Sequence, residues 1–192
     1  RITAMILADG TMGQMMEPVE LSADSVKTFE KPWAVTGTKM QRKHNIINSL
    51  SLVPEELEQQ NFARYERYKV IEENEARYEA FMMDDAEYCV VAFGIAARVS
   101  KNAVMAAREK GIKVGLIRPI TLWPFPKKAL LDAAAGAKAF ISVELSMGQM
   151  IEDIELAIRC QRPVLLCNRA GGMIPTPEQV LEKIEEASGG KF

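Results

Sequence analysis

The sequence is poor in the residues that build metal sites and disulfides. It has three cysteines and one histidine among 192 residues, and no Cys-x-x-Cys pair. Zinc and iron–sulfur sites need several such ligands at short spacings, so we expect no metal or cluster on this chain alone. Cys89 and Cys167 lie in apolar runs, where a free thiol usually packs as a small hydrophobic side chain. This cysteine usage favours a reducing, cytoplasmic setting.

Excess charge and long apolar runs are also absent. The net charge is −2, from 24 Lys and Arg against 26 Asp and Glu, which gives no support for a nucleic-acid-binding face. No apolar run approaches the roughly 20 residues of a membrane helix, so we expect no membrane contact. The G-x-G-x-x-G and G-x-S-x-G motifs of dinucleotide-binding enzymes and serine hydrolases are missing. His44, the only histidine, stands in a basic polar segment, and we expect it to be solvated.

The N-terminal part of the chain does not have the composition of a complete domain. The chain begins with Arg1 rather than Met and runs directly into a strand-like pattern, "ITAMILAD". We therefore expect a piece of a longer protein, with residues 1–50 as the last strand and tail of a truncated domain. Residues 51–86 are expected to be a linker carrying one long amphipathic helix over 55–83, because apolar side chains recur there at helical spacing.

Residues 87–192 alternate between short apolar runs and helical patterns. Thr176 and Gln179 have the spacing of a capping box, with Pro177 at the first helical position. Four buried strands separated by helices predict an α/β domain, in which a mostly parallel sheet lies between two helical layers. The strands are expected at 88–93, 113–118, 139–144 and 163–168, and the helices at 97–111, 127–136, 147–159 and 176–187.

A decapeptide occurs twice in the chain, as "MGQMMEPVEL" at 12–21 and "MGQMIEDIEL" at 147–156, with seven of ten positions identical. Each copy follows a strand-like run and opens a helical pattern. We therefore expect both at the carboxyl end of a strand, where open α/β sheets bind ligands. Two interpretations stay open: similar corners in two α/β domains, or ordinary strand-to-helix joints with methionine in the core.

Three acidic candidates carry weaker signals. Asp9 lies in "ADG", close to the G-D-G that opens the magnesium–diphosphate motif of thiamine-diphosphate enzymes. Ala8 replaces the first glycine and the next asparagines come too late, so we do not expect Asp9 to bind magnesium. Glu144 and Asp153 are a candidate catalytic pair only if the fold brings them together.

Further candidates stand at expected strand ends. Gly94 is a lone glycine at a strand-to-helix turn. Arg169, followed by "AGG", predicts either an anion or carboxylate site or a simple turn. The segment "RPITLWPFP" at 118–126 contains three prolines and Trp123, which is more typical of an interface or lid than of a catalytic loop.

Several stretches, taken in order, resemble one known family: "DGTMGQMMEPVE", "WAVTGT", "GIKVGLIRPITLWPFP", "VELSMGQMIEDIE" and "NRAGGMIPTPEQVLEKI". They are similar to the C-terminal half of the α-type subunit of 2-oxoacid:ferredoxin oxidoreductases. The likeness is greatest to the branched-chain type that acts on 2-oxoisovalerate (3-methyl-2-oxobutanoate). It covers essentially the whole chain.

The resemblance implies a domain plan and an activity. Residues 1–50 would end a pyrimidine-binding domain, and 87–192 would be a transketolase-C-terminal-like domain. The reaction would be oxidative decarboxylation of a 2-oxoacid with coenzyme A, giving acyl-CoA, CO2 and reduced ferredoxin. Thiamine diphosphate and magnesium would be bound mainly by the missing domain and a β-type subunit. Iron–sulfur [4Fe-4S] clusters would lie on partner chains, with γ/δ-type subunits and ferredoxin as further partners in a dimer or higher oligomer.

The resemblance also suggests site residues, although no catalytic residue is expected here and the chain alone would be inactive. The first-domain loop, with Asp9, Gly10, Gly13 and Glu17, would approach the cofactor interface. The second domain would present its strand-end residues to substrate or partner: Gly94, Arg118, Glu144, Gly148, Gln149, Arg169, Gly171 and Gly172.

A competing interpretation makes the α/β domain a non-catalytic assembly module. Convergence of Gly94, Arg118 and Arg169 on one polar cleft would favour ligand binding. An edge dominated by apolar side chains would favour assembly, and its candidates are Met147, Met150, Ile151 and Trp123.

Overall fold

The computed structural model describes residues 3–20 and 29–190. The chain divides into two compact units. One combines the residues up to Met15 with those from Lys69 onwards, and the other comprises the residues from Met16 to Tyr68. The first unit contains the α/β domain.

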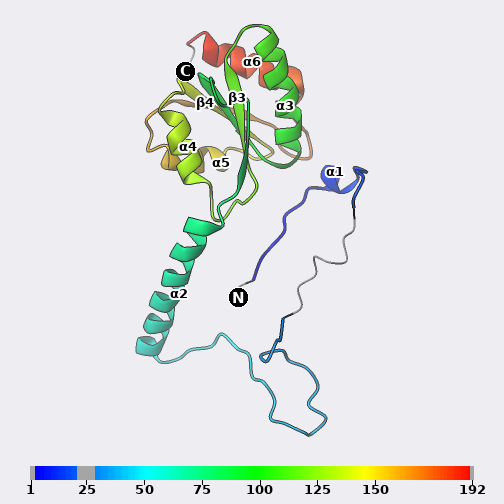
Figure 1. Cartoon of the computed structure of the whole chain (residues 1–192), viewed down its shortest axis with the longest axis vertical. Coiled ribbons are helices and arrows are strands. Elements are labelled where there is room, and N and C mark those ends of the chain that lie inside the picture. The colour runs from blue at the N-terminus through cyan, green and yellow to red at the C-terminus, as the bar shows by residue number, and fades with distance from the viewer. Residues whose placement is uncertain (1–2, 21–28, 191–192) are drawn as a thin grey trace. The chain divides into compact units, whose positions relative to one another are not determined.

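A five-stranded sheet forms the centre of the α/β domain (Figure 1). Its spatial order is β1-β3-β2-β4-β5, in which β2 to β5 are parallel and β1 runs antiparallel to β3. The strands are β1 (Tyr78–Phe81), β2 (Tyr88–Ala92), β3 (Val114–Pro119), β4 (Ala139–Glu144) and β5 (Val164–Asn168).

Helices cover both faces of this sheet, with α3 (Gly94–Glu109) and α6 (Pro177–Ser188) on one face. The other face is covered by α4 (Lys127–Ala134) and α5 (Met150–Ala157). Successive side chains of a strand point to opposite faces, so each buried strand serves both cores. In β2, Val90 packs in the α3/α6 core, while Val91 packs in the α4/α5 core.

The three-layer α/β/α arrangement predicted from the sequence is therefore confirmed. All four expected strands and all four expected helices of residues 87–192 form within a few residues of their expected bounds. The capping box is also present: Gln179 N donates to Thr176 Oγ1 at 3.3 Å, and Thr176 N donates to Gln179 Oε1 at 3.1 Å.

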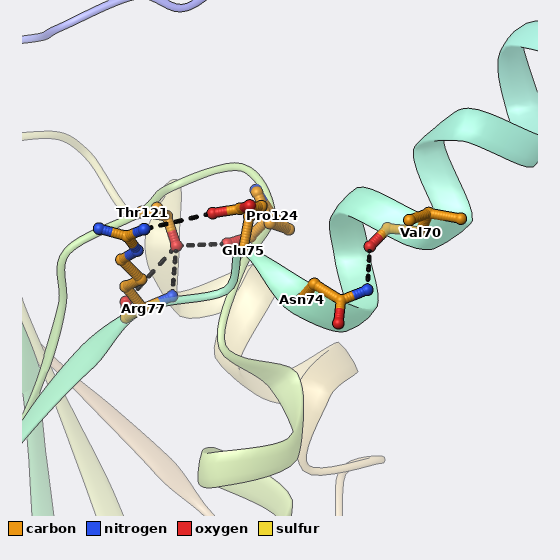
Figure 2. Close-up of polar contacts among 6 residues, drawn as sticks. All are labelled: Val70, Asn74, Glu75, Arg77, Thr121 and Pro124. Carbon is orange, nitrogen blue, oxygen red and sulfur yellow. Dashed lines mark hydrogen bonds and ion pairs between the residues drawn. The ribbon is translucent and has the colours of Figure 1, made fainter. Parts of the chain in front are cut away.

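The expected helix over 55–83 is wrong at its C-terminal end. Helix α2 (Pro54–Asn74) stops at Asn74, whose side chain donates to Val70 O at 2.7 Å (Figure 2). The chain then joins the domain, because Arg77 N donates to Thr121 Oγ1 at 2.9 Å. From Tyr78 onwards the chain forms β1 along the free edge of β3. Backbone pairing with that edge outweighs the helical spacing of the apolar residues.

The amphipathic character expected of α2 is also not realised, since none of its residues is buried. Phe62 and Tyr65 are 60% and 65% exposed. Tyr65 instead contacts Tyr68 on the next turn, with ring centroids 5.8 Å apart. The helix therefore derives no stability from a buried face within this chain.

The strand expected at the start of the chain does not form. Residues 3–9 are extended without a strand partner, and a strand needs a neighbour for its hydrogen-bond ladder. One helical turn follows, α1 (Gly10–Gly13), capped by Asp9, whose Oδ1 accepts from Met12 N at 2.7 Å. Residues 14–20 contain no helix, which agrees with Pro18 favouring a short or irregular turn in the first decapeptide copy. Leu21, the last residue of that copy, lies outside the described residues.

Candidate functional site

The carboxyl ends of β2 and β4 create a topological switch point. These strands are neighbours, yet the chain leaves β2 towards α3 on one face and leaves β4 towards α5 on the other. The loops therefore diverge and leave a crevice, which is where open α/β sheets bind ligands. A ligand site is therefore expected at this edge.

A recess of about 330 Å³ lies at this edge. Residues from the first decapeptide region supply a polar wall, and residues after β4 and β5 supply a mostly apolar one. The lining residues are Asp9, Gly10, Thr11, Gln14, Leu145, Gly172, Met173 and Ile174. The recess thus combines hydrogen-bonding and apolar groups, as small-molecule sites usually do.

Gly94 begins α3 beside this recess. Its φ of +58° lies in the left-handed region, and a Cβ at this position would lie 3.4 Å from Asp9 Oδ2. Helix α3 has no side-chain cap, because its N-cap residue is Phe93. The Asp9 carboxylate therefore lies close to an uncapped helix start, where a negative charge is favourable.

Glu144 ends β4 and is 3% exposed. Its carboxylate accepts five hydrogen bonds of 2.6–3.0 Å, from the hydroxyls of Ser142 and Ser146 and the amides of Gln149, Met150 and Ile151. Burial raises the pKa of Glu144, but these hydrogen bonds outweigh burial and hold the pKa below its ordinary value. The side chain is an ionised cap of the α5 N-terminus.

Glu144 and Asp153 do not form a catalytic pair. Asp153 is exposed on α5, whereas Glu144 is buried and its oxygens are occupied by donors. A general acid must release its proton near the working pH, and a carboxyl with a lowered pKa is poorly suited to that task. The structure gives Glu144 a positioning role.

The loop between β4 and α5 is fixed at several points. Gly148 has a φ of +104°, and a Cβ there would lie 3.3 Å from Leu166 Cδ2. Asn168 Nδ2 donates to Ser146 O at 2.7 Å. Gln149 is the last residue before α5, and its amide is one of those bound by Glu144. The second decapeptide copy is therefore a rigid corner.

Arg118 does not reach the recess. It lies on β3 and forms an ion pair with Glu79 of β1, with 3.2 Å between Nη1 and Oε2. Lys101 Nζ donates to the other oxygen of Glu79 at 2.5 Å. The hydrogen bond from Lys101 lowers the pKa of Glu79, burial opposes it, and the positive charges of Lys101 and Arg118 lower the pKa further. This cluster ties the edge strand β1 to β3 and α3.

Arg169 lines a different hollow, of about 360 Å³, together with Lys183 and Glu186 of α6. Its amide donates to Glu144 O at 3.1 Å. Gly171 and Gly172 follow with φ values of +65° and +88° and turn the chain after β5. Only Gly172 of this group lines the first recess. Gly94, Arg118 and Arg169 therefore do not converge on one cleft, which is the arrangement that would have favoured ligand binding.

The apolar candidates of this edge differ in their exposure to solvent. Met147 is 80% exposed and Trp123 is 50% exposed, while Met150 is buried and Ile151 half-buried. From the first loop, Gly10 lines the recess with Asp9, whereas Gly13 does not. Glu17 is exposed and belongs to the other unit.

Sequence reasoning missed five residues that line the recess: Thr11, Gln14, Leu145, Met173 and Ile174. All of them lie within or next to the motifs singled out above, so the motifs located the site but not its lining. Among the described residues, no group of three His, Cys, Asp or Glu side chains could hold a metal ion. Nor is any described helix long and apolar enough to cross a membrane.

Comparison with known proteins decides the family. Residues 86–180 match the family "Pyruvate:ferredoxin oxidoreductase core domain II". Over 190 residues the chain is 47% identical to the ketoisovalerate oxidoreductase subunit VorB of Methanothermobacter marburgensis, an alignment that covers 98% of this chain and 53% of that subunit. The chain belongs to the 2-oxoacid:ferredoxin oxidoreductase family. It spans about half the length of the curated relatives with which it aligns over 190 residues.

Another relative is similar over a shorter stretch. The 2-oxoglutarate synthase subunit KorA of Methanocaldococcus jannaschii is 36% identical over 96 residues, which are 50% of this chain and 26% of that subunit.

Solved structures support the fold. A 2-oxoglutarate:ferredoxin oxidoreductase from Magnetococcus marinus, solved with 2-oxoglutarate, coenzyme A and succinyl-CoA, aligns with 87% of this chain and 30% of its own. The TM-score is 0.60 at 19% identity. A split-gene transketolase, an inactive beta4 tetramer, aligns with 60% of this chain and 42% of its own, at a TM-score of 0.53 and 17% identity. These likenesses agree with the transketolase-C-terminal-like fold predicted from the sequence.

Proposed function

We propose that the chain is part of the α-type subunit of a thiamine-diphosphate-dependent oxidoreductase that acts on 2-oxoisovalerate. The enzyme would decarboxylate the 2-oxoacid oxidatively with coenzyme A, yielding acyl-CoA, CO2 and reduced ferredoxin. The observation that carries this proposal is the 47% identity to a ketoisovalerate subunit across 98% of the chain. The 2-oxoglutarate subunit of Methanocaldococcus jannaschii is less similar and matches only half of the chain.

The described residues do not fit the magnesium–diphosphate group of thiamine diphosphate. They contain no cluster of potential metal ligands, and the Asp9 carboxylate is engaged at α1 and close to α3. The cofactor and its magnesium would therefore be bound by other parts of the subunit and by a β-type partner. The [4Fe-4S] clusters and the contact with ferredoxin would likewise belong to partners, including γ/δ-type subunits, in a dimer or higher oligomer.

The apolar residues of the N-terminal segments support a tail that packs on another body. Ile6 and Met16 are 94% and 98% exposed, and Met40 and Ile46 are 98% and 82% exposed. Soluble proteins rarely leave so many large apolar side chains in water. Residues 1–50 would thus complete a pyrimidine-binding domain, while 51–86 link it to the α/β domain at 87–192. A cytoplasmic location stays a prediction.

A purified complex containing this chain tests the proposed activity. Its coenzyme A-dependent reduction of ferredoxin is measured with 2-oxoisovalerate, 2-oxoglutarate and pyruvate as alternative substrates. We expect the highest kcat/KM with 2-oxoisovalerate. A preference for 2-oxoglutarate or pyruvate would overturn the substrate assignment, and no coenzyme A-dependent turnover with any of them would overturn the reaction.

The assembly-module interpretation remains the second candidate, favoured by the exposure of Met147 and Trp123 at the strand ends. The engagement of Arg118 by Glu79 also removes one cation from the strand-end residues that could contact a ligand. Calorimetric titration of the chain with coenzyme A separates the two roles. Saturable binding would favour a substrate-binding domain. Absence of binding, with concentration-dependent self-association in light scattering, would favour assembly.

A further inference from the structure

The internal repeat extends beyond the decapeptide. In the same register, Asp9 matches Glu144 and Thr11 matches Ser146, so both copies read acid-x-hydroxyl-Met-Gly-Gln. We name residues 9–14 the first acidic loop and residues 144–149 the second acidic loop. The matched positions are a carboxylate and a hydroxyl, which are the groups that can fix a loop by hydrogen bonding.

The second acidic loop shows what its carboxylate does. Glu144 accepts hydrogen bonds from Ser146 Oγ within the loop and from the amides of Met150 and Ile151 at the start of α5. One side chain thereby holds both the loop and the helix that follows. Such charge-assisted bonds at a helix N-terminus are stronger than neutral ones.

The first acidic loop has a related arrangement around a different helix. Asp9 Oδ1 accepts from Met12 N at 2.7 Å, and its other oxygen, Oδ2, lies by Gly94 at the start of α3. Turn α1 lies beside α3 (Figure 1). One oxygen thus fixes the loop locally, while the other faces the helix that lacks a side-chain cap.

Both loops border the same recess. The first loop contributes Asp9, Gly10, Thr11 and Gln14, and the second contributes Leu145. The helices that the two carboxylates face, α3 and α5, are the two that diverge at the switch point between β2 and β4. The repeated sequence therefore occupies the two sides of one crevice.

We propose that the two acidic loops are paired walls of this recess, and that Asp9 is the positioning residue that docks the first loop against the start of α3, as Glu144 fixes the second loop at α5. The inference rests on the proposed function only for its kinetic test. The docking itself is measurable without turnover.

Hydrogen–deuterium exchange of the purified complex tests the docking. Asp9→Asn keeps an oxygen that can accept from Met12 N but removes the charge facing α3. We expect exchange in residues 94–98 to rise about fivefold, in line with charge effects at helix starts, while 10–14 changes little. Asp9→Ala should accelerate exchange in both segments. Glu20 is an exposed acid outside the recess, so Glu20→Gln should accelerate exchange in neither segment. If Asp9 has a purely local role, exchange at the start of α3 should be the same in Asp9→Asn as in the wild type. That result would overturn the proposal.

Kinetics of the same variants separate positioning from general damage. If the first loop is a wall of a substrate recess, Asp9→Asn should raise KM for the oxoacid or for coenzyme A about fivefold, with kcat nearly kept. A fall in kcat with KM unchanged for both substrates would indicate loss of active complex and contradict the positioning role. If the wild-type complex shows no oxidoreductase turnover, the proposed function fails, whereas the exchange result still decides whether the loops are docked.

Discussion

The α/β domain and the segments that precede it differ in how far their apolar side chains are buried. In the domain, Phe140 and Ile154 are completely buried between the sheet and its helices. In the preceding segments, Ile6, Met40 and Phe62 are largely exposed. Burial of apolar surface is the dominant favourable contribution to folding, so the first region carries its own stability and the second does not.

The largest expected effect contrasts two phenylalanines. Phe140→Ala removes a ring from the closed α4/α5 core and should lower the free energy of unfolding by about 3–5 kcal/mol. Phe62→Ala, on the exposed helix α2, should change it by less than about 0.5 kcal/mol. Urea unfolding of the two variants measures both values. Equal losses of unfolding free energy in the two variants would show that α2 is buried in solution. The difference between the domain and the preceding segments would then not exist.

The next effect concerns the buried carboxylate of the second acidic loop. Glu144→Gln replaces one acceptor oxygen by an NH2 group that faces amide donors, and should cost about 2–3 kcal/mol at neutral pH. Because the pKa of folded Glu144 lies below its ordinary value of 4.5, its stabilising contribution is complete above that pH. The contribution is lost as the pH falls through the lower folded pKa. Denaturant unfolding from pH 7 to 3 should therefore show the two proteins converging in stability at acidic pH.

Glu155→Gln is the matched control for this carboxylate, since Glu155 is exposed on the same helix but lies outside its first turn. It should leave both the stability at neutral pH and its pH dependence nearly unchanged. A constant difference between wild type and Glu144→Gln at every pH would mean that hydrogen-bond geometry, rather than charge, stabilises the α5 start.

Sequence patterns predicted the elements whose signals are local. Short apolar runs located β2 to β5, and the spacing of Thr176 and Gln179 located the start of α6. The edge strand β1 was missed because its pairing with β3 depends on residues about 40 positions away, such as Arg118 opposite Glu79. Local periodicity cannot report that partner.

The site was predictable in position but not in detail. The repeat and the glycine corners indicated the carboxyl edge of the sheet, and the recess lies there. Arg118 was a candidate at this edge because it ends an expected strand, but its engagement by Glu79 depends on the strand register. The role of Glu144 likewise follows from the helix start that folds around it, which the one-dimensional pattern does not specify.

A smaller effect tests the corner where the first acidic loop meets α3. Gly94→Ala places a Cβ in a left-handed backbone conformation, which should destabilise the α/β domain by about 1–2 kcal/mol. The new methyl group would also lie 3.4 Å from Asp9 Oδ2, an ordinary contact distance, so strain rather than collision is the main cause. Gly136→Ala is the control, because that glycine has no positive φ and open space around it. If both variants unfold at the same denaturant concentration, the backbone conformation at position 94 does not require glycine.

The smallest effect compares a helix cap in the ordered domain with a hydroxyl in the exposed segment. Thr176→Ala removes the acceptor for Gln179 N at the start of α6 and should cost about 1 kcal/mol. Thr3→Ala alters an exposed residue near the start of the chain and should cost almost nothing. Thermal unfolding of both variants measures the difference. A cap matters only if its helix is held by the cooperative core, and α6 buries Val180 and Ile184 against the sheet. An unchanged melting temperature in Thr176→Ala would therefore mean that α6 frays before the domain unfolds, and the boundary between stable and unsupported regions would have to be placed before α6.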